Sequence, residues 1–373
     1  MAVSGVTEPW SDGSRTSSRS GLVTATLLVL AAALTTALLV FSASNELLAW
    51  DLRFAYLPAA EAVLAGDSPY PALDDPILED QKGYVYPPLL VVSLLPLAWL
   101  PVDVAALLTA VSMLVLVGLT LRVLGVRDVR CYAALLMWMP VASAVLLGNL
   151  SIPLGLAVAV AWRYRDHVWQ PAVALGLSVS AKLVMWPLLV WTVATGRMRQ
   201  TAGAVAVGIV ATFGAWAAIG FEGLREYPDL LRRLSEIQSE NSYSFVGMAS
   251  TLGLGEAVGR AAMLVVGGAL LVGTIVLARR GDDVRSFTCA VAATLALSPI
   301  VWLHYLVVLV VPLAISRPRF SPLWLLPMLL WVSPRPGYAE GLQTFAPAVV
   351  AVVVVALLLS SPARRPSAEL AAS

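Results

Sequence analysis

Long apolar segments separated by short polar ones occupy most of the chain between residues 21 and 360. About 20 apolar residues cross a bilayer as a helix, and fewer suffice inside a bundle or beside a wet cavity. The pattern therefore predicts an all-α polytopic membrane protein. About twelve transmembrane spans are expected, at 21–41, 104–124, 131–147, 150–162, 168–180, 183–194, 201–219, 258–278, 286–301, 305–315, 320–332 and 345–359.

Two polar segments interrupt this pattern, and we name them the first polar loop (44–86) and the second polar loop (220–256). The first carries eight carboxylates against only Arg53 and Lys82, so it cannot lie in hydrocarbon. In the second, Leu224, Tyr227 and Leu231 recur at helical spacing among charged residues. This spacing predicts an amphipathic helix lying on the membrane surface.

The composition is typical of a membrane protein and gives no sign of a nucleic-acid partner. Hydrophobic residues make up 59% of the chain and charged residues 13%, with a mean hydropathy of +0.83, which argues against a soluble domain. A net charge of +1 gives no support for a nucleic-acid partner. We expect one transmembrane domain (21–360), surrounded by membrane lipids, between a polar tail (1–20) and a disordered tail (361–373). The oligomeric state is left open.

Arginine placement orients the expected spans, because cytoplasmic loops are enriched in Arg and Lys. With the N-terminus inside, the twelve spans place sixteen of the 22 arginines in cytoplasmic segments. Both termini then face the cytoplasm, and both polar loops face outward from the plasma membrane. Residues 86–100 are apolar but hold Pro87, Pro88 and Pro96, and a thirteenth span there would move the arginines of 122–130 outside. We therefore expect a short element at the membrane edge.

Polar residues from distant parts of the chain fall on the expected outer side. Polar side chains at membrane depth are costly and usually face a bundle interior or a cavity. A single outward-opening site is therefore predicted, and its candidate members are Asp51, Asn149, Lys182, Asn241 and His304.

Three of these residues allow a chemical and a plainer interpretation. Asp51 follows the first span and could be a catalytic base or an ordinary solvated acid. Lys182 lies alone between two short apolar segments, where its ammonium could bind a phosphate or reach for the interface. His304, one of two histidines, could donate a hydrogen bond to a phosphate or a sugar, or serve the fold alone.

An ordered series of short motifs runs through the chain. It consists of Asp51, YLPAA from Tyr56, GDSPY from Gly66, YPPL from Tyr86, LPLA from Leu95, Gly148-Asn149, Lys182 with Pro187, and SPIVWLHY from Ser298. In this order the series resembles the GT-C class of integral-membrane glycosyltransferases, and more narrowly glycosyltransferase family 87. The resemblance implies a GT-C-type bundle with a large first extracytoplasmic loop.

The resemblance also implies a reaction at the outer face of the membrane. A sugar, typically mannose, would pass from a polyprenyl-phosphate donor to a hydroxyl of a lipid-linked glycan acceptor, with inversion at the anomeric carbon. The catalytic base of the family maps onto Asp51. Arg53 stands where many GT-C members have a second acid, so we expect neither a metal nor another cofactor.

Further ligands are expected around that base. Lys182, His304 and Arg53 are candidates for binding the donor phosphate. The candidates for binding the sugar and acceptor are Tyr86, Asn149, Asn241 and Ser242. Each of these four could equally be a helix cap, a turn residue or an interfacial anchor.

Two alternatives stay open at this point. Arabinofuranose could replace mannose as the transferred sugar. A lipid or sugar transporter or flippase would also be a polytopic bundle with a polar cavity. Many transporters, however, are built from internal repeats around a site at the midplane, whereas no repeat is visible and the candidate residues gather on one side.

Overall fold

The computed structural model describes residues 13–332 and 341–360. Helices are the regular structure found in these residues, and no strand occurs among them, which confirms the all-α prediction. The expected tail at 361–373 and residues 1–12 of the expected polar tail lie outside the described residues.

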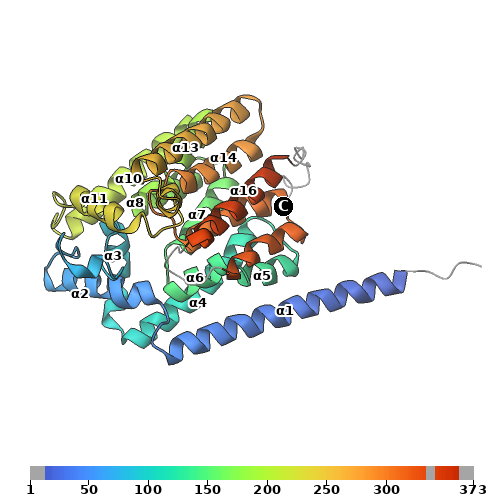
Figure 1. Cartoon of the computed structure of the whole chain (residues 1–373), viewed down its shortest axis with the longest axis horizontal. Coiled ribbons are helices and arrows are strands. Elements are labelled where there is room, and N and C mark those ends of the chain that lie inside the picture. The colour runs from blue at the N-terminus through green and yellow to red at the C-terminus, as the bar shows by residue number, and fades with distance from the viewer. Residues whose placement is uncertain (1–12, 333–340, 361–373) are drawn as a thin grey trace, which may run out of the picture.

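The described residues form sixteen α-helices joined by short helical turns (Figure 1). The α-helices are α1 (Gly13–Ser44), α2 (Leu57–Ala65), α3 (Pro88–Leu94), α4 (Val102–Val123), α5 (Val129–Leu136), α6 (Met139–Leu147), α7 (Ser151–Arg163), α8 (Trp169–Ala181), α9 (Pro187–Ala194), α10 (Met198–Ala218), α11 (Tyr227–Gln238), α12 (Phe245–Thr251), α13 (Glu256–Arg279), α14 (Asp283–Ala296), α15 (Val310–Ser316) and α16 (Ala346–Ser360). The turns are the π-helical η1 (Leu52–Tyr56) and the 3₁₀-helical η2 (Pro76–Leu78), η3 (Leu95–Trp99), η4 (Leu183–Met185), η5 (Leu303–Leu309), η6 (Pro322–Val332) and η7 (Gly341–Phe345).

Five helical segments in the described residues are long and apolar enough to cross a membrane. They are Gly21–Ser44 of α1, the helices α4, α10 and α13, and the segment Gly341–Ser360. Helices α5 and α6 add a sixth if they form one span bent by 65°. Several other apolar helices are only 10–17 residues long. A multi-pass membrane protein is therefore supported, whereas the count of twelve spans stays a prediction.

Prolines account for much of this shortening. The span expected at 131–147 is broken, because Pro140 occupies the first turn of α6 and cannot continue the helix from α5. Pro187 begins α9 in the same way, just after the break at Lys182. In a bundle, such breaks place side chains and freed backbone groups inside the apolar layer.

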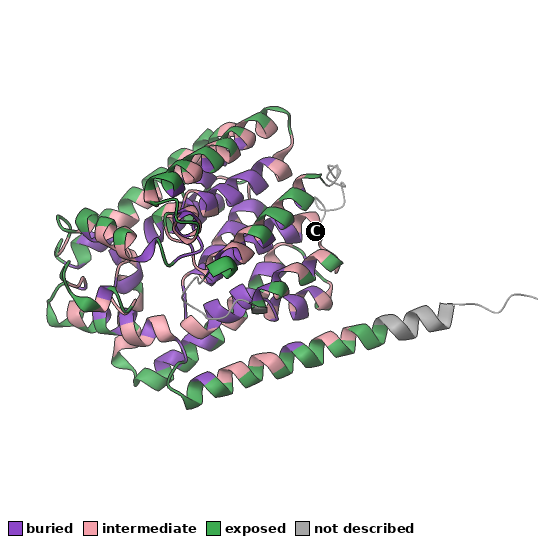
Figure 2. Ribbon diagram, viewed as in Figure 1, coloured by how far each residue is buried: buried purple, intermediate pink, exposed green. Residues whose placement is uncertain are grey.

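Helix α1 lies along one edge of the molecule and leaves the bundle toward its N-terminal end (Figures 1 and 2). Only 6% of its most apolar 18-residue window is buried. Its inward contact is made by Ala31, which packs beside Ala133 of α5 and the adjacent Met137. Leu22, at 70% exposure, shows the apolar surface that lipid would cover.

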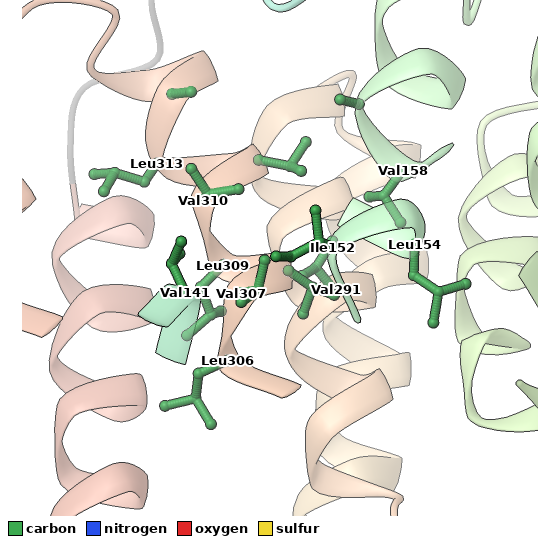
Figure 3. Packing of buried hydrophobic residues seen from close by; sticks show 14 of the residues in the cluster. Val141, Ile152, Leu154, Val158, Val291, Leu306, Val307, Leu309, Val310 and Leu313 are labelled. Carbon is green, nitrogen blue, oxygen red and sulfur yellow. The ribbon is translucent and has the colours of Figure 1, made fainter. Parts of the chain in front are cut away.

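The main hydrophobic core joins α6, α7, α14, η5 and α15. Figure 3 shows Ile152 of α7, Val291 of α14 and Val307 of η5 in this core, and each is at most 4% exposed. The core therefore fixes the beginnings of α7 and η5. These two beginnings carry candidate site residues.

A polar cluster closes the far end of α7. Asp283 accepts hydrogen bonds from Trp191 at 2.8 Å, from Arg197 at 2.7 Å and from Arg165 at 3.2 Å. Arg165 and Arg197 belong to the segments expected to be cytoplasmic. The 13 residues of α7 separate this cluster from the start of the helix by about 20 Å.

The two polar loops pack against each other, with α2, α3 and α11 at one end of the molecule (Figure 1). Gln238 of α11 donates to the carbonyl of Leu78 at 2.9 Å and accepts from Gln81 at 3.2 Å. Tyr227 of α11 donates to the carbonyl of Val85 at 3.2 Å. The predicted helix in the second polar loop therefore forms, and it covers the first.

Helices α8 and α10 approach closely through glycine. A Cβ on Gly176 would lie 2.6 Å from the carbonyl oxygen of Ala204 and 2.8 Å from the Cβ of Val207. Small residues allow two helix backbones to come this close in a membrane bundle. The contact positions the end of α8, where Lys182 follows.

We expect Gly176→Ala to lower the free energy of unfolding by about 1–3 kcal/mol, because the added methyl group forces the two helices apart. The apparent melting temperature in detergent micelles measures this loss. Gly214→Ala, on α10, is the matched control, since a Cβ there meets no atom within 4 Å. Equal melting temperatures for the two variants would contradict the close-packing interpretation.

Candidate active site

Asp51 lies at a tight turn between α1 and α2. Ala49 has a positive φ of 55° and is fully buried, so the chain reverses sharply just before the carboxylate. The π-helical turn η1 follows, in which the N–H of Leu57 bonds to the carbonyl of Leu52. Isolated π-helical turns occur frequently at functional sites. This wide turn brings Tyr56 back toward Asp51, and the Tyr56 hydroxyl donates to Asp51 Oδ2 at 3.2 Å.

Asn149 reaches the same carboxylate from the other side. Helix α6 ends at Gly148, whose φ of +67° is in the left-handed region that favours glycine. A Cβ on Gly148 would lie 3.2 Å from the Cβ of Ala49, so the two turns are in close contact. Asn149 Nδ2 donates to Asp51 Oδ2 at 2.6 Å.

Both hydrogen bonds to Asp51 go to Oδ2. The other carboxylate oxygen, Oδ1, receives none from the part of the chain that the structure describes. Oδ1 is also not among the fully buried atoms that lack a partner. One oxygen of Asp51 is therefore held by the protein, and the second is open to a substrate.

Tyr86 completes this polar group, at the end of the first polar loop. Its hydroxyl accepts from Asn149 Nδ2 at 3.3 Å, and its ring meets that of Tyr56 edge to face at 5.6 Å. Tyr70 donates to the Tyr86 carbonyl at 3.1 Å and stacks on Trp216. Contacts within the first polar loop and with α10 therefore position Tyr86.

Lys182 lies in the break between α8 and η4, in an extended conformation. Its side chain is 9% exposed, and its Nζ has no hydrogen-bond partner among the described residues. Nζ lies 3.3 Å from the centroid of the Tyr305 ring and 5.7 Å from that of Tyr86. A buried cation held only by aromatic faces is poorly compensated.

A small hollow adjoins this ammonium. Its polar lining comes from Ser151, Lys182, Thr294 and Tyr305, and apolar side chains such as Leu154 line the rest. Lys182 is also close enough to Asp51 for their charges to interact. Lys182 therefore lines the hollow, and the charge of Asp51 acts on its ammonium from nearby.

His304 lies at the start of η5, next to Tyr305. It is 5% exposed, and its ring meets that of Tyr305 edge to face at 5.0 Å. Its Nε2 has no hydrogen-bond partner among the described residues. An unpartnered buried ring nitrogen beside Lys182 can accept or donate a hydrogen bond to a ligand.

Burial dominates the electrostatics of Asp51. Desolvation raises the pKa of its carboxyl to about 6, although hydrogen bonds from Asn149 and Tyr56 and the charge of Lys182 act in the opposite direction. A carboxylate with this pKa is more basic than a solvated aspartate and is still mostly ionised at neutral pH.

Three other candidates have different surroundings. Arg53 donates to the carbonyl of Leu48 at 2.8 Å and forms its ion pair with Asp103 rather than with Asp51. Ser242 is buried and donates to the Ser239 carbonyl at 2.8 Å within its own turn. Asn241, the neighbour of Ser242, is exposed.

Sequence reasoning overlooked the roles of Tyr56, Ser151 and Tyr305. Tyr56 is five residues from Asp51, a spacing that produces a contact only in a π-helical turn. Ser151 lies two residues after Asn149, the spacing of an Asx turn, and this signal was available in the sequence. Tyr305 entered the sequence analysis only as the last residue of the SPIVWLHY motif.

No group of three or more His, Cys, Asp or Glu side chains that could hold a metal ion occurs within 13–332 and 341–360. The expectation of a metal-independent site stays a prediction.

Comparisons with known proteins agree with the resemblance in the motifs. The model of glycosyltransferase family 87 matches residues 84–299. A polyprenol-phosphate-mannose-dependent alpha-(1-2)-phosphatidylinositol mannoside mannosyltransferase from Mycolicibacterium smegmatis is 24% identical over 292 residues. The match covers 66% of this chain and 66% of that protein, slightly less than two thirds of its length. No solved structure matches the chain.

Residues 84–299 include Tyr86, Asn149 and Lys182, while Asp51 and His304 lie outside the matched segment. The matched segment is more than half of the 373 residues, and the chain belongs to glycosyltransferase family 87.

Proposed function

We propose that the protein transfers a sugar, with mannose as the first candidate, from a polyprenyl-phosphate donor to a hydroxyl of a lipid-linked acceptor. The observation that carries this proposal is the carboxylate of Asp51, held through one oxygen, near the Lys182 ammonium, which has no hydrogen-bond partner among the described residues. The relative's name gives polyprenol-phosphate-mannose as its donor and a phosphatidylinositol mannoside as its acceptor. Family membership and this relative support a donor and acceptor of the same kind here.

Asp51 acts as the general base of a single displacement. Its free Oδ1 takes the proton of the acceptor hydroxyl while the hydroxyl oxygen forms a bond to the anomeric carbon. The bond from that carbon to the phosphate oxygen breaks, and its electron pair leaves with the phosphate. Attack opposite to the leaving group inverts the anomeric centre.

Lys182 and His304 bind the phosphate of the donor. Lys182 Nζ and His304 Nε2 are buried and have no hydrogen-bond partner among the described residues. The oxygens of a donor phosphate would accept hydrogen bonds from both. The phosphate gains charge as it leaves, so a fixed cation stabilises the transition state more than the ground state. Arg53 fits this role less well, because Asp103 already pairs with it.

The reaction takes place at the outer face of the plasma membrane. Asp51 and Asn149 lie at one end of α7, and the Arg165–Asp283–Arg197 cluster lies at the other. The enrichment of Arg on the cytoplasmic side favours this orientation. Of the other expected sugar and acceptor ligands, Tyr86 shares the Asn149 amide with Asp51, while Asn241 and Ser242 stay predictions from their place in the second polar loop.

We expect Asp51→Asn to reduce glycosyl transfer by about 10²- to 10⁴-fold, because the amide cannot take the acceptor proton. Radiolabelled polyprenyl-phosphate mannose supplied to purified protein with a lipid acceptor measures the rate. Asp74→Asn, at an exposed acid of the same loop, is the matched control and should keep full activity. Near-normal turnover by the Asp51 variant would refute the proposed role.

The rate should fall as the pH drops through about 6, since protonation of Asp51 removes the base and the pKa of that carboxyl is raised to about 6 by burial. The pH dependence of kcat/KM in the wild type checks this expectation. An acid limb centred near the pKa of a solvated aspartate, about 4, would contradict it.

Lys182→Met should raise the KM for the donor about tenfold or more, because a charge-assisted contact with the phosphate is lost. Folding should survive, because the variant removes a buried charge that has no hydrogen-bond partner within 13–332 and 341–360. Lys82→Met provides the matched control, as Lys82 is partly exposed and pairs with Asp80. An unchanged donor KM and rate in the Lys182 variant would exclude phosphate binding by this residue.

A further inference from the structure

We propose that Asn149 is a positioning residue for proton transfer: its amide, oriented by Ser151, fixes one oxygen of Asp51 and leaves the other free for the acceptor hydroxyl. The inference rests on the proposed role of Asp51 as base. It assigns Asn149 to the carboxylate, in place of the expected contact with a sugar or acceptor.

The orientation of the Asn149 amide follows from the donors around it. Asn149 Oδ1 accepts from the backbone N–H of Ser151 at 3.0 Å and from the Ser151 hydroxyl at 2.9 Å. A backbone N–H can only donate, so the oxygen of the amide must face Ser151. The Nδ2 group is therefore directed at Asp51 Oδ2, which it reaches at 2.6 Å.

The backbone around Asn149 allows it little freedom. Asn149 is 1% exposed and Ser151 is 2% exposed. A Cβ on Gly148 would lie 3.1 Å from Thr109 Cγ2 and 3.2 Å from Ala49 Cβ, so α4 and the turn before Asp51 enclose the turn that carries the amide. The first turn of α7 thus holds the amide in register with the carboxylate.

This geometry removes a degree of freedom that the base would otherwise have. A carboxylate held only by Tyr56, at 3.2 Å, could rotate and present either oxygen. The shorter bond from Asn149 selects Oδ2 as the held oxygen and stabilises the charged form of Asp51. Oδ1 is then left without a donor from the described residues and is held in one orientation.

Four other groups among the described residues interact with the Asp51 carboxylate besides Asn149. Tyr56 donates to the same oxygen, and Lys182 interacts with the carboxylate through its charge. Tyr86 and Tyr305 also lie near enough for electrostatic interaction, and both are neutral phenols at working pH. A substitution at Asn149 leaves the contacts of Tyr56 and Lys182 with Asp51 in place and removes the longer bond from Asn149 to the Tyr86 hydroxyl, at 3.3 Å.

The test is the pH dependence of kcat/KM for Asn149→Ala. Losing a hydrogen bond to the charged form should move the acid limb upward by about one pH unit, since such bonds favour that form tenfold or more. The value of kcat should fall about fivefold at pH 6, with little change in the KM for donor or acceptor. Asn45→Ala, at an exposed asparagine of the first polar loop, should match the wild type throughout.

Two further variants keep the test decisive if Asn149→Ala folds poorly. Asn149→Asp preserves shape but places a second carboxylate beside Asp51, which should move the acid limb further upward or abolish the rate. Ser151→Ala retains the backbone donor and loses one contact to the amide, so a smaller shift in the same direction is expected.

A raised acceptor KM with an unmoved acid limb in Asn149→Ala would overturn the inference and return Asn149 to sugar binding. An unmoved acid limb in Asn149→Asp would also overturn it. These failures differ from failure of the proposed function, which appears instead as an active Asp51→Asn variant.

Discussion

A carboxylate enclosed by an apolar bundle loses its hydration and must be compensated by nearby donors or else become protonated. Asp51 lies between full compensation by donors and protonation. The bonds from Asn149 and Tyr56 keep it largely ionised at neutral pH, yet burial leaves its pKa raised. A solvated acid would be a weaker base, and a more deeply buried one would be protonated. The site thus depends on partial compensation, which requires two donors in defined positions.

Those positions are set by interruptions of helices. Gly148 ends α6 in the left-handed region, and Lys182 leaves α8 in an extended conformation. Asp51 lies before a π-helical turn, and His304 stands at the start of a 3₁₀-helical one. A continuous helix in a bundle presents side chains at its surface, whereas a break directs side chains along the axis and frees backbone groups inside the apolar layer. The core around α7 and η5 fixes these breaks relative to one another.

The sequence predicted much of this site from hydrophobicity and arginine placement. Asp51, Asn149 and Lys182 were assigned to one side of the membrane, and the structure brings these three together. The span count was less predictable, because Pro140 and Pro187 divide apolar stretches without changing their hydropathy. Individual partners were least predictable. The pairing of Arg53 with Asp103 depends on a residue 50 positions away, and the Tyr56 contact depends on a π-helical turn that no residue pattern marks.

The unpaired charge of Lys182 links donor binding to the strength of the base under the proposed function. In the free protein this charge acts on Asp51 and lowers the pKa of its carboxyl. A donor phosphate that pairs with Lys182 neutralises much of that charge, so Asp51 becomes more basic once the donor is in place. Asp51 is then the strongest base when the donor sugar is bound, so that the acceptor hydroxyl loses its proton when its oxygen can bond to the anomeric carbon. An ion pair between Lys182 and a protein carboxylate would remove this coupling, which gives a physical reason why no described residue bonds to the Lys182 ammonium.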